Sequence, residues 1–245
     1  MKTKNYVFLL LLLPCVFASC DDTQLDKNPC FLLETVFINN DERLLNYDAV
    51  NDSEREPYFI EEFDDNNSQF PYQIGTDTDV EVSITDGKMA ITYLVDSGYF
   101  YWEPIPIEID ENRNFEMETS MIIHSDSLRQ TFACLPNQSG IKNIYSIDYG
   151  LFEDSNNKKI EYVSLSNFTN EWYTINGYDF NAKDFLNSNK FTVLTIRKIG
   201  NKYAIFINHK LFYIINDKNF IYVPAITMDE AVINVFDYFR VYYLP

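Results

Sequence analysis

Two glutamates, Glu116 and Glu118, are the residues whose type and spacing most directly suggest chemistry. They lie two apart in the alternating run Phe115–Ile123, so an extended chain rising about 3.3 Å per residue puts them on one face, roughly 7 Å apart. Inverting glycosidases hold their acid and base about 6.5–9.5 Å apart, and retaining enzymes about 5–5.5 Å. The pair is the catalytic candidate of this sequence, against the alternative of a solvated acidic strand face.

Aromatic side chains are a second set with chemical potential, because they make up 16% of the chain. Most are expected in a core, where Phe and Tyr bury well. Within Tyr99–Ile109 the odd positions are predicted to point inward, which turns Phe100 and Trp102 outward. Trp172 shares a parity with Asn176. These four residues are candidate contacts for a sugar ring, and the alternative is packing at a rim under a loop.

Hard oxygen donors suggest calcium at two acidic turns, Asp64 with Asp65 and Asp77 with Asp79. The alternative is that these carboxylates are simply solvated. The two histidines lie far apart in sequence, so no zinc site is predicted.

The first 19 residues form an export signal. Two lysines precede an apolar run from Tyr6 to Phe17, which is too short to span a bilayer. The run ends in Ala18-Ser19-Cys20 and resembles the bacterial lipoprotein signal, in which that cysteine is acylated and becomes the new N-terminus. The alternative is an ordinary secretory signal cleaved near Ala18.

An acidic stretch follows at Cys20–Asp26. It resembles the tether that sends some lipoproteins of Gram-negative glycan degraders to the outer face of the outer membrane. We therefore expect an outer-membrane lipoprotein of the cell envelope, exposed at the surface, unless this stretch is only a linker. Cys30 and Cys134 then form a disulfide closing a loop of about a hundred residues, worth roughly 4–5 kcal/mol, or remain two buried thiols.

Composition narrows the class of protein. The chain has 245 residues, 46% of them apolar, which is a globular balance. The net charge of −18 excludes a basic nucleic-acid footprint and adhesion to anionic lipids through basic residues. Seven glycines are too few for most phosphate-binding loops.

Short alternating runs separated by turn residues fill the chain from residue 57 onward. This rhythm predicts an all-β fold, a two-sheet antiparallel β-sandwich of the jelly-roll type with little helix. Asp86-Gly87 predicts a tight hairpin turn, and the only helix-like piece is Tyr178–Leu186. The expected organisation is a signal peptide at 1–19, a tether and extension at 20–56, and one sandwich domain at 57–245.

Seven segments follow one another in a characteristic order: Phe59–Asn66, Asp86–Ile91, Asn114–Glu118, Asp148–Phe152, Phe191–Lys198, Tyr203–Asn208 and Val235–Val241. Taken in this order, they resemble the concanavalin A-like lectin and glucanase superfamily, in its laminarin-binding-like branch. Its glucanases carry Glu-x-Asp-x-x-Glu on one strand, whereas here Glu108-Ile109-Asp110 is followed by a turn and Arg113 replaces the last glutamate.

The resemblance implies a carbohydrate-related function without deciding among lectins, glycosidases and adhesive modules. We expect a lipid-anchored, non-catalytic glycan-binding protein that needs no cofactor, with calcium as an alternative. The rival readings are a glycoside hydrolase or lyase that uses Glu116 and Glu118, and a structural module of a surface complex.

Overall fold

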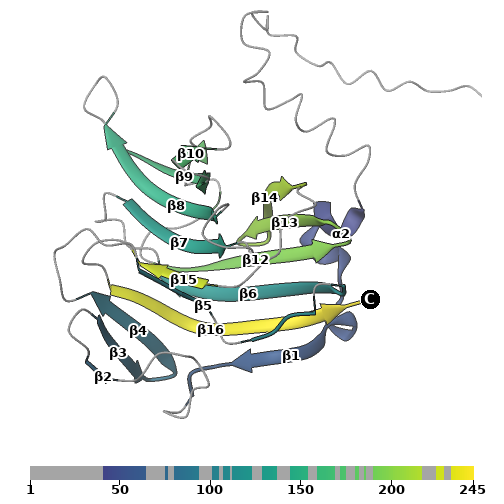
Figure 1. The fold of residues 1–245 in the computed structure, drawn as a ribbon, viewed down its shortest axis with the longest axis horizontal. Helices are drawn as coiled ribbons and strands as arrows, with labels where there is room; N and C mark the ends of the chain where they lie inside the picture. Colours follow the sequence, from purple (N-terminus) through teal and green to yellow (C-terminus); the bar gives the residue numbers. More distant parts are fainter. Residues whose placement is uncertain are drawn as a thin grey trace, which may run out of the picture.

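The protein is built from two antiparallel sheets with almost no helix, as the computed structural model in Figure 1 shows. This confirms the predicted all-β fold class. The structure describes residues 41–64, 75–76, 80–93, 101–104, 107–110, 112–122, 129–136, 144–153, 159–168, 172–174, 180–181, 185, 190–216, 225–228 and 233–245.

The nine-stranded sheet, sheet A, has the long strands β6 and β16 at its centre. Its order is β14 (Lys210–Ile215), β13 (Lys202–Ile207), β12 (Phe191–Ile199), β6 (Asn114–Ile122), β16 (Ile233–Leu244), β4 (Lys88–Tyr93), β3 (Val80–Thr85) and β2 (Gly75–Thr76), with β1 (Glu56–Glu61) also paired to β16.

The second sheet, which we call sheet B, has seven strands. Its order is β10 (Trp172–Thr174), β9 (Lys159–Phe168), β8 (Ile144–Glu153), β7 (Arg129–Pro136), β15 (Ala225–Met228) and β5 (Tyr101–Pro104), with β11 (Phe180–Asn181) paired to β9.

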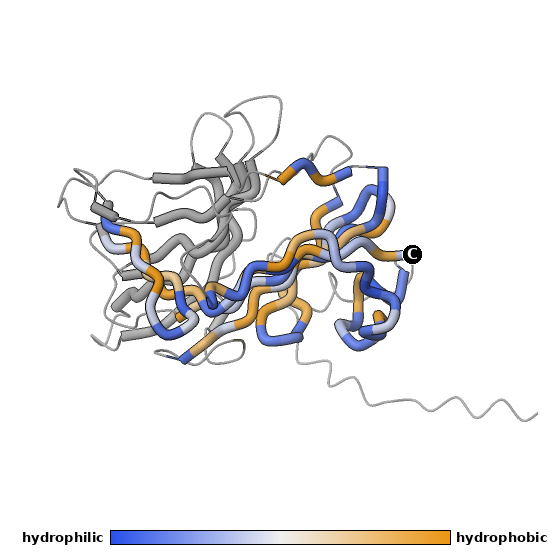
Figure 2. The backbone as a smooth tube through the Cα atoms, turned by 90° about the horizontal axis from the view of Figure 1, so that it is seen from below, coloured by the Kyte–Doolittle hydropathy of each residue, from blue (hydrophilic) through white to orange (hydrophobic). Residues whose placement is uncertain are grey.

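The main core covers one face of sheet A, which we call its inner face. In β6 the odd residues Phe115, Met117 and Met121 are buried in this core, as the alternation predicts. Ile107 and Ile109, which lie outside any strand, pack against the same core, while the outward direction expected of Phe100 and Trp102 stays a prediction. Figure 2 shows the resulting succession of hydrophobic and hydrophilic stretches along the described strands.

Two hairpin turns use the left-handed backbone region. Asp86 and Gly87 have φ of 53° and 70°, which confirms the turn that this dipeptide predicts. Asn208 and His209 have φ of 48° and 65°, so an asparagine and a histidine take up the same conformation between β13 and β14.

Three details differ from the sequence expectation. The helix predicted at 178–186 is wrong, because Phe180–Asn181 pairs with β9 as strand β11. The long strand expected over 99–109 ends at Pro104, since proline cannot donate to a ladder. Strands β7 and β15 lie in segments for which no strand was expected.

Residues 41–55, which we call the N-terminal strap, lie against the face of sheet A opposite the main core, its outer face. The strap contains α2 (Glu42–Leu45) and the 3-10 helices η2 (Tyr47–Ala49) and η3 (Asp52–Glu54). Leu44 and Val50 are buried in a second apolar cluster with Phe206 and Leu244. The helix α2 lies at the same end of the sheet as the C-terminus (Figure 1).

Candidate functional site

The two candidate carboxylates lie together on the outer face of sheet A, but neither is solvated. Glu116 is fully buried and Glu118 is 8% exposed, because the strap and neighbouring side chains cover them. The alternative that these two carboxylates lie on a solvated strand face is therefore wrong. Alternation alone could not reveal this, since the covering strap lies some 60–70 residues earlier in the chain.

Glu116 is held between two arginines. Its Oε1 accepts a hydrogen bond from Arg55 Nε at 2.7 Å, and its Oε2 accepts one from Arg197 Nε at 2.5 Å. The side chains of all three residues are at most 9% exposed. Both carboxylate oxygens of Glu116 therefore accept charge-assisted hydrogen bonds from buried guanidinium groups.

Arg197 ties the strap to the sheet. Its Nη1 donates to the backbone oxygens of Arg43 and Asn46 at 2.8 and 3.0 Å, and its Nη2 donates to that of Tyr47 at 2.8 Å. Burial lowers the pKa of Arg197, and the adjacent Glu116 carboxylate opposes that shift. The guanidinium thus meets carbonyl or carboxylate oxygen on each of its nitrogens, which offsets the cost of burying its charge.

Glu118 is the acceptor for three hydroxyl groups. Tyr47 donates to its Oε2 at 2.8 Å, Tyr238 to its Oε1 at 2.9 Å, and Thr195 to its Oε2 at 3.2 Å. Burial raises the pKa of both tyrosines, and the negative charge of Glu118 raises each further. Stable hydroxyl contacts, rather than an open reaction site, surround this carboxylate.

Sequence reasoning missed the cations of this network. Arg197 lies in the largely apolar run of β12, where it shares a parity with Thr195 and Ile199. That parity places it on the outer face, but no local signal indicates that a strap contributes three carbonyls to it. Arg55 lies in a charged run that reads as a solvated spacer.

A second polar surface lies on the part of the outer face formed by β1 and β16. Arg240 donates to both carboxylate oxygens of Glu62, at 2.7 and 2.9 Å, and its guanidinium lies 3.8 Å over the Tyr238 ring. Ile60, which pairs with Arg240, is 44% exposed. This outer-face patch (Ile60, Glu62, Tyr238 and Arg240) combines an aromatic ring with fixed hydrogen-bonding groups.

The two tryptophans lie at opposite edges of sheet B. Trp102 lies on the edge strand β5 and pairs with Thr227 of β15. Trp172 lies on the edge strand β10 and pairs with Phe168 of β9. Five strand spacings separate these edges, which is on the order of 24 Å for a flat sheet. Trp102 and Trp172 therefore cannot form one stacking platform. Phe100 and Asn176 lie outside the described residues.

The calcium hypothesis rests on residues that the structure covers only in part. Asp64 is exposed beside the β3–β4 hairpin, while Asp65, Asp77 and Asp79 lie outside the described residues. Within the described ranges, no three acidic, histidine or cysteine residues gather as a metal site requires.

The acylation of Cys20 and the disulfide between Cys30 and Cys134 stay predictions. Cys20 and Cys30 lie outside the described residues, and Cys134 is placed in β7 opposite Ser146. In the part of the chain that the structure describes, no helix is long and apolar enough to cross a membrane.

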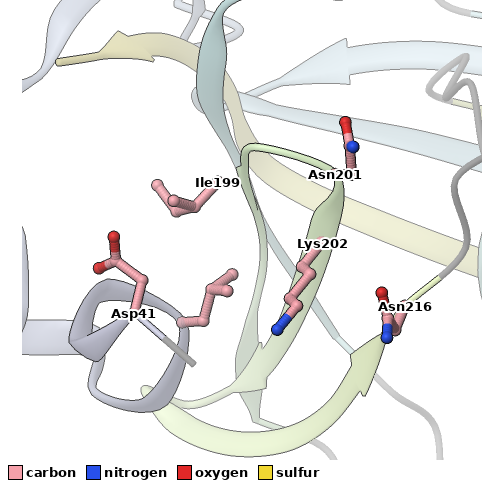
Figure 3. A pocket seen from close by; sticks show the side chains of 6 residues that line it. Asp41, Ile199, Asn201, Lys202 and Asn216 are labelled. Carbon is pink, nitrogen blue, oxygen red and sulfur yellow. The ribbon is translucent and has the colours of Figure 1, made fainter. Parts of the chain in front are cut away.

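A pocket of about 350 Å³ opens between the start of the strap, the β12–β13 hairpin and the end of β14 (Figure 3). Its lining combines two buried aliphatic side chains with four polar ones. These residues are Asp41, Leu44, Ile199, Asn201, Lys202 and Asn216.

Replacing Glu116 with glutamine should lower the free energy of unfolding by about 3–5 kcal/mol, because it leaves Arg197 buried without its counter-charge. Urea denaturation at pH 7 measures the loss. The matched control is Glu56→Gln, which breaks an exposed ion pair with Arg113 and should cost less than about 1 kcal/mol. Equal losses in the two variants would show that the buried network does not stabilise the fold.

Stability should also fall above about pH 10, where unfolded tyrosines ionise. Tyr47 and Tyr238 have raised folded-state pKa values, so they stay protonated in the folded protein while the unfolded chain releases their protons. Each then lowers the free energy of unfolding by up to about 1.4 kcal/mol per pH unit. The double variant Tyr47→Phe/Tyr238→Phe should show a shallower decline in urea denaturation between pH 10 and 12, and an unchanged slope contradicts this assignment.

Comparisons with known proteins show the fold and no family. No protein-family model and no curated protein matches the sequence. Among solved structures, the CBM2 module of the evolved Dit protein of Lactobacillus casei BL23 phage J-1 superposes with a TM-score of 0.53 and 11% identity, over 78% of this chain and 96% of that module.

Two enzyme structures superpose equally well. A structure from the endo-acting O-glycanases with which members of the human gut microbiota initiate mucin breakdown has a TM-score of 0.53 and 9% identity, over 78% of this chain and all of that one. The xylan β-1,4-xylosidase of Bacillus halodurans C-125 has a TM-score of 0.53 and 11% identity, over 75% of this chain and 38% of the xylosidase. The chain thus shares an antiparallel β-sandwich fold with these solved structures.

Proposed function

We propose that this protein is a lipid-anchored, non-catalytic glycan-binding module of the bacterial cell envelope. One observation carries the non-catalytic part. Glu116, half of the only carboxylate pair that the sequence offered for acid–base chemistry, is buried between Arg55 and Arg197. A glycosidase needs a carboxyl group that reaches the glycosidic oxygen of its substrate, whereas both oxygens of Glu116 are buried and hydrogen-bonded to arginines.

Glycan binding is supported by the fold and by what its structural neighbours do. One neighbour is a CBM2 module, one is an O-glycanase that acts on mucin, and one is a xylosidase. The fold itself is compatible with several functions, so the binding surface must carry the assignment. Trp102 and Trp172 are our first candidates, and the outer-face patch around Arg240 is the second.

Charge favours neutral or weakly basic glycans. The net charge of −18 opposes the approach of sulfated and uronic-acid polymers over distances of about 8–10 Å at physiological salt. A flat tryptophan ring offers an apolar face to a pyranose, and neighbouring polar groups fix the orientation of its hydroxyls.

The alternative function is a glycoside hydrolase. The two enzyme neighbours favour it, and it requires an acid pair other than Glu116 and Glu118. Incubating any bound glycan with the protein and measuring new reducing ends separates the two functions. We expect binding without product.

Acylation at Cys20 is the anchoring prediction. Two or more acyl chains, each contributing about 0.8 kcal/mol per buried CH₂, hold a protein stably on a membrane. Cys20→Ala should therefore move the protein from the membrane fraction to the soluble fraction, and wild type should show lipid mass on Cys20. A mutant that still pellets with the envelope, together with a wild type lacking lipid, contradicts the anchor.

One tryptophan, not both, should support glycan binding, because Trp102 and Trp172 lie at opposite edges of sheet B. The mature chain carrying Cys20→Ala is first screened on a glycan array, and the ligand found is then titrated against Trp102→Ala and Trp172→Ala. We expect one variant to lose binding by at least tenfold and the other to bind as wild type, with little change in melting temperature for the variant that loses binding.

Two results contradict this site assignment. If both variants unfold, the tryptophans belong to the core. If both stay folded and bind as wild type does, the stacking platform lies elsewhere on the molecule.

A further inference from the structure

The pocket beside the strap is a surface that the tryptophan hypothesis does not use. We infer that it binds one neutral sugar unit, at the end or at a branch of a glycan. This inference rests on the proposed glycan-binding function and gives it a second contact, on sheet A rather than sheet B. The argument comes from the floor of the pocket, its rim, its charge and its size.

The floor is aliphatic and fixed. Leu44 and Ile199 line the pocket and are 1% and 8% exposed. Both belong to the apolar cluster between the strap and sheet A, so neighbouring side chains hold them in place. The small apolar surface that these two side chains still expose at the pocket suits contact with the C–H face of a pyranose ring, since removing apolar surface from water is favourable.

The rim carries hydrogen-bonding groups of both kinds. Asp41 supplies a carboxylate, Lys202 an ammonium group, and Asn201 and Asn216 supply amides that both donate and accept. Figure 3 shows these four side chains arranged around the pocket from three different elements. Sugar hydroxyls also donate and accept, so a mixed rim of this kind matches them better than it matches a ligand of one sign of charge.

Asp41 is a preorganised acceptor with capacity to spare. Its Oδ1 accepts from the backbone N and the Nε of Arg43 at 2.9 and 3.0 Å, and its Oδ2 accepts from Arg43 Nη2 at 2.8 Å. A carboxylate has about four lone-pair sites, so one remains on Oδ2 for a ligand hydroxyl. The Arg43 side chain lowers the pKa of Asp41, which keeps this acceptor ionised at neutral pH.

The ion pair between Asp41 and Arg43 also affects the charge at the pocket. Arg43 neutralises Asp41, and it is itself positioned by a hydrogen bond from its Nη1 to the backbone oxygen of Pro245 at 2.7 Å. The backbone oxygen of Arg43 accepts from the buried Arg197 at 2.8 Å. The described lining of the pocket carries one negative charge, on Asp41, and one positive charge, on Lys202, and this balance favours a neutral ligand.

The size of the pocket limits the ligand. A volume of about 350 Å³ lies at the low end of ligand pockets, which span about 300–1,000 Å³. It fits one sugar unit better than an oligosaccharide. Among the described residues that line it there is one carboxylate and no histidine or cysteine, so the lining supports binding rather than bond cleavage.

Substitution of Asn216 tests the inference most cleanly. Asn216 is exposed at the end of β14, so Asn216→Trp fills the mouth of the pocket without changing the core. The matched control is Asn112→Trp, an exposed asparagine in a turn outside the pocket. The protein is the mature chain carrying Cys20→Ala, and the probes are methyl glycosides of glucose, galactose, mannose, fucose and N-acetylglucosamine, measured by saturation-transfer NMR at millimolar concentration.

We expect wild type to bind at least one of these glycosides, Asn216→Trp to weaken that binding at least tenfold, and Asn112→Trp to leave it unchanged. A second variant, Asp41→Asn, keeps an N-cap side chain for α2 but breaks the Arg43 pair, and should weaken binding while the protein stays folded.

The outcomes separate this inference from the function on which it rests. If wild type binds a glycan on the array but no methyl glycoside, or if Asn216→Trp binds as wild type does, the pocket is not a sugar site and the proposed function stands. If wild type binds no glycan on the array and no glycoside, the proposed function fails and the pocket inference fails with it.

Discussion

The buried guanidinium of Arg197 is the interaction on which the outer face of this protein depends. An arginine with no exposed surface is costly unless every donor meets an oxygen, because a buried unpaired charge costs several kcal/mol. Here Glu116 supplies the counter-charge, and the backbone of residues 43–47 supplies three carbonyls. These hydrogen bonds hold the strap on the sheet, together with the apolar cluster that buries Leu44 and Val50.

Other features follow from that position of the strap. Tyr47 comes to lie over the sheet with its ring 5.3 Å from the Arg197 guanidinium, and its hydroxyl reaches Glu118. The His209 ring then stacks on the outer side of Tyr47 at 3.9 Å. The two carboxylates whose spacing on the strand suggested glycoside cleavage instead accept hydrogen bonds that connect the strap to the sheet. The spacing of two carboxylates on a strand is therefore a poor guide to catalysis unless their hydrogen-bond partners and burial are known.

Sequence predicted what is local and failed where distant segments meet. Alternation in 115–123 placed Phe115 and Met117 in the core, and the Asp86-Gly87 turn was predicted because both residues tolerate positive φ. By contrast, the cover over Glu116 depends on Arg55 and Arg197, which lie 61 and 81 residues away in sequence. No periodicity within one strand encodes such a contact. The pocket was missed for the same reason, since its walls come from the strap, a hairpin and the end of β14.

The strap packs on sheet A and also lines the proposed pocket through Asp41 and Leu44. Asp41 lies at the start of the strap as the N-cap of α2, and Arg43 connects it both to the C-terminal Pro245 and to Arg197. The Asp41 carboxylate is held by the Arg43 guanidinium, and the backbone oxygen of the same Arg43 accepts a hydrogen bond from Arg197, which anchors the strap. A four-residue helix has little stability of its own, because helix nucleation is unfavourable and short helices rely on tertiary contacts. The position of this rim therefore depends on the contacts that hold the strap on the sheet, so a ligand at the proposed pocket would depend on the same Arg197 contacts that stabilise the outer face.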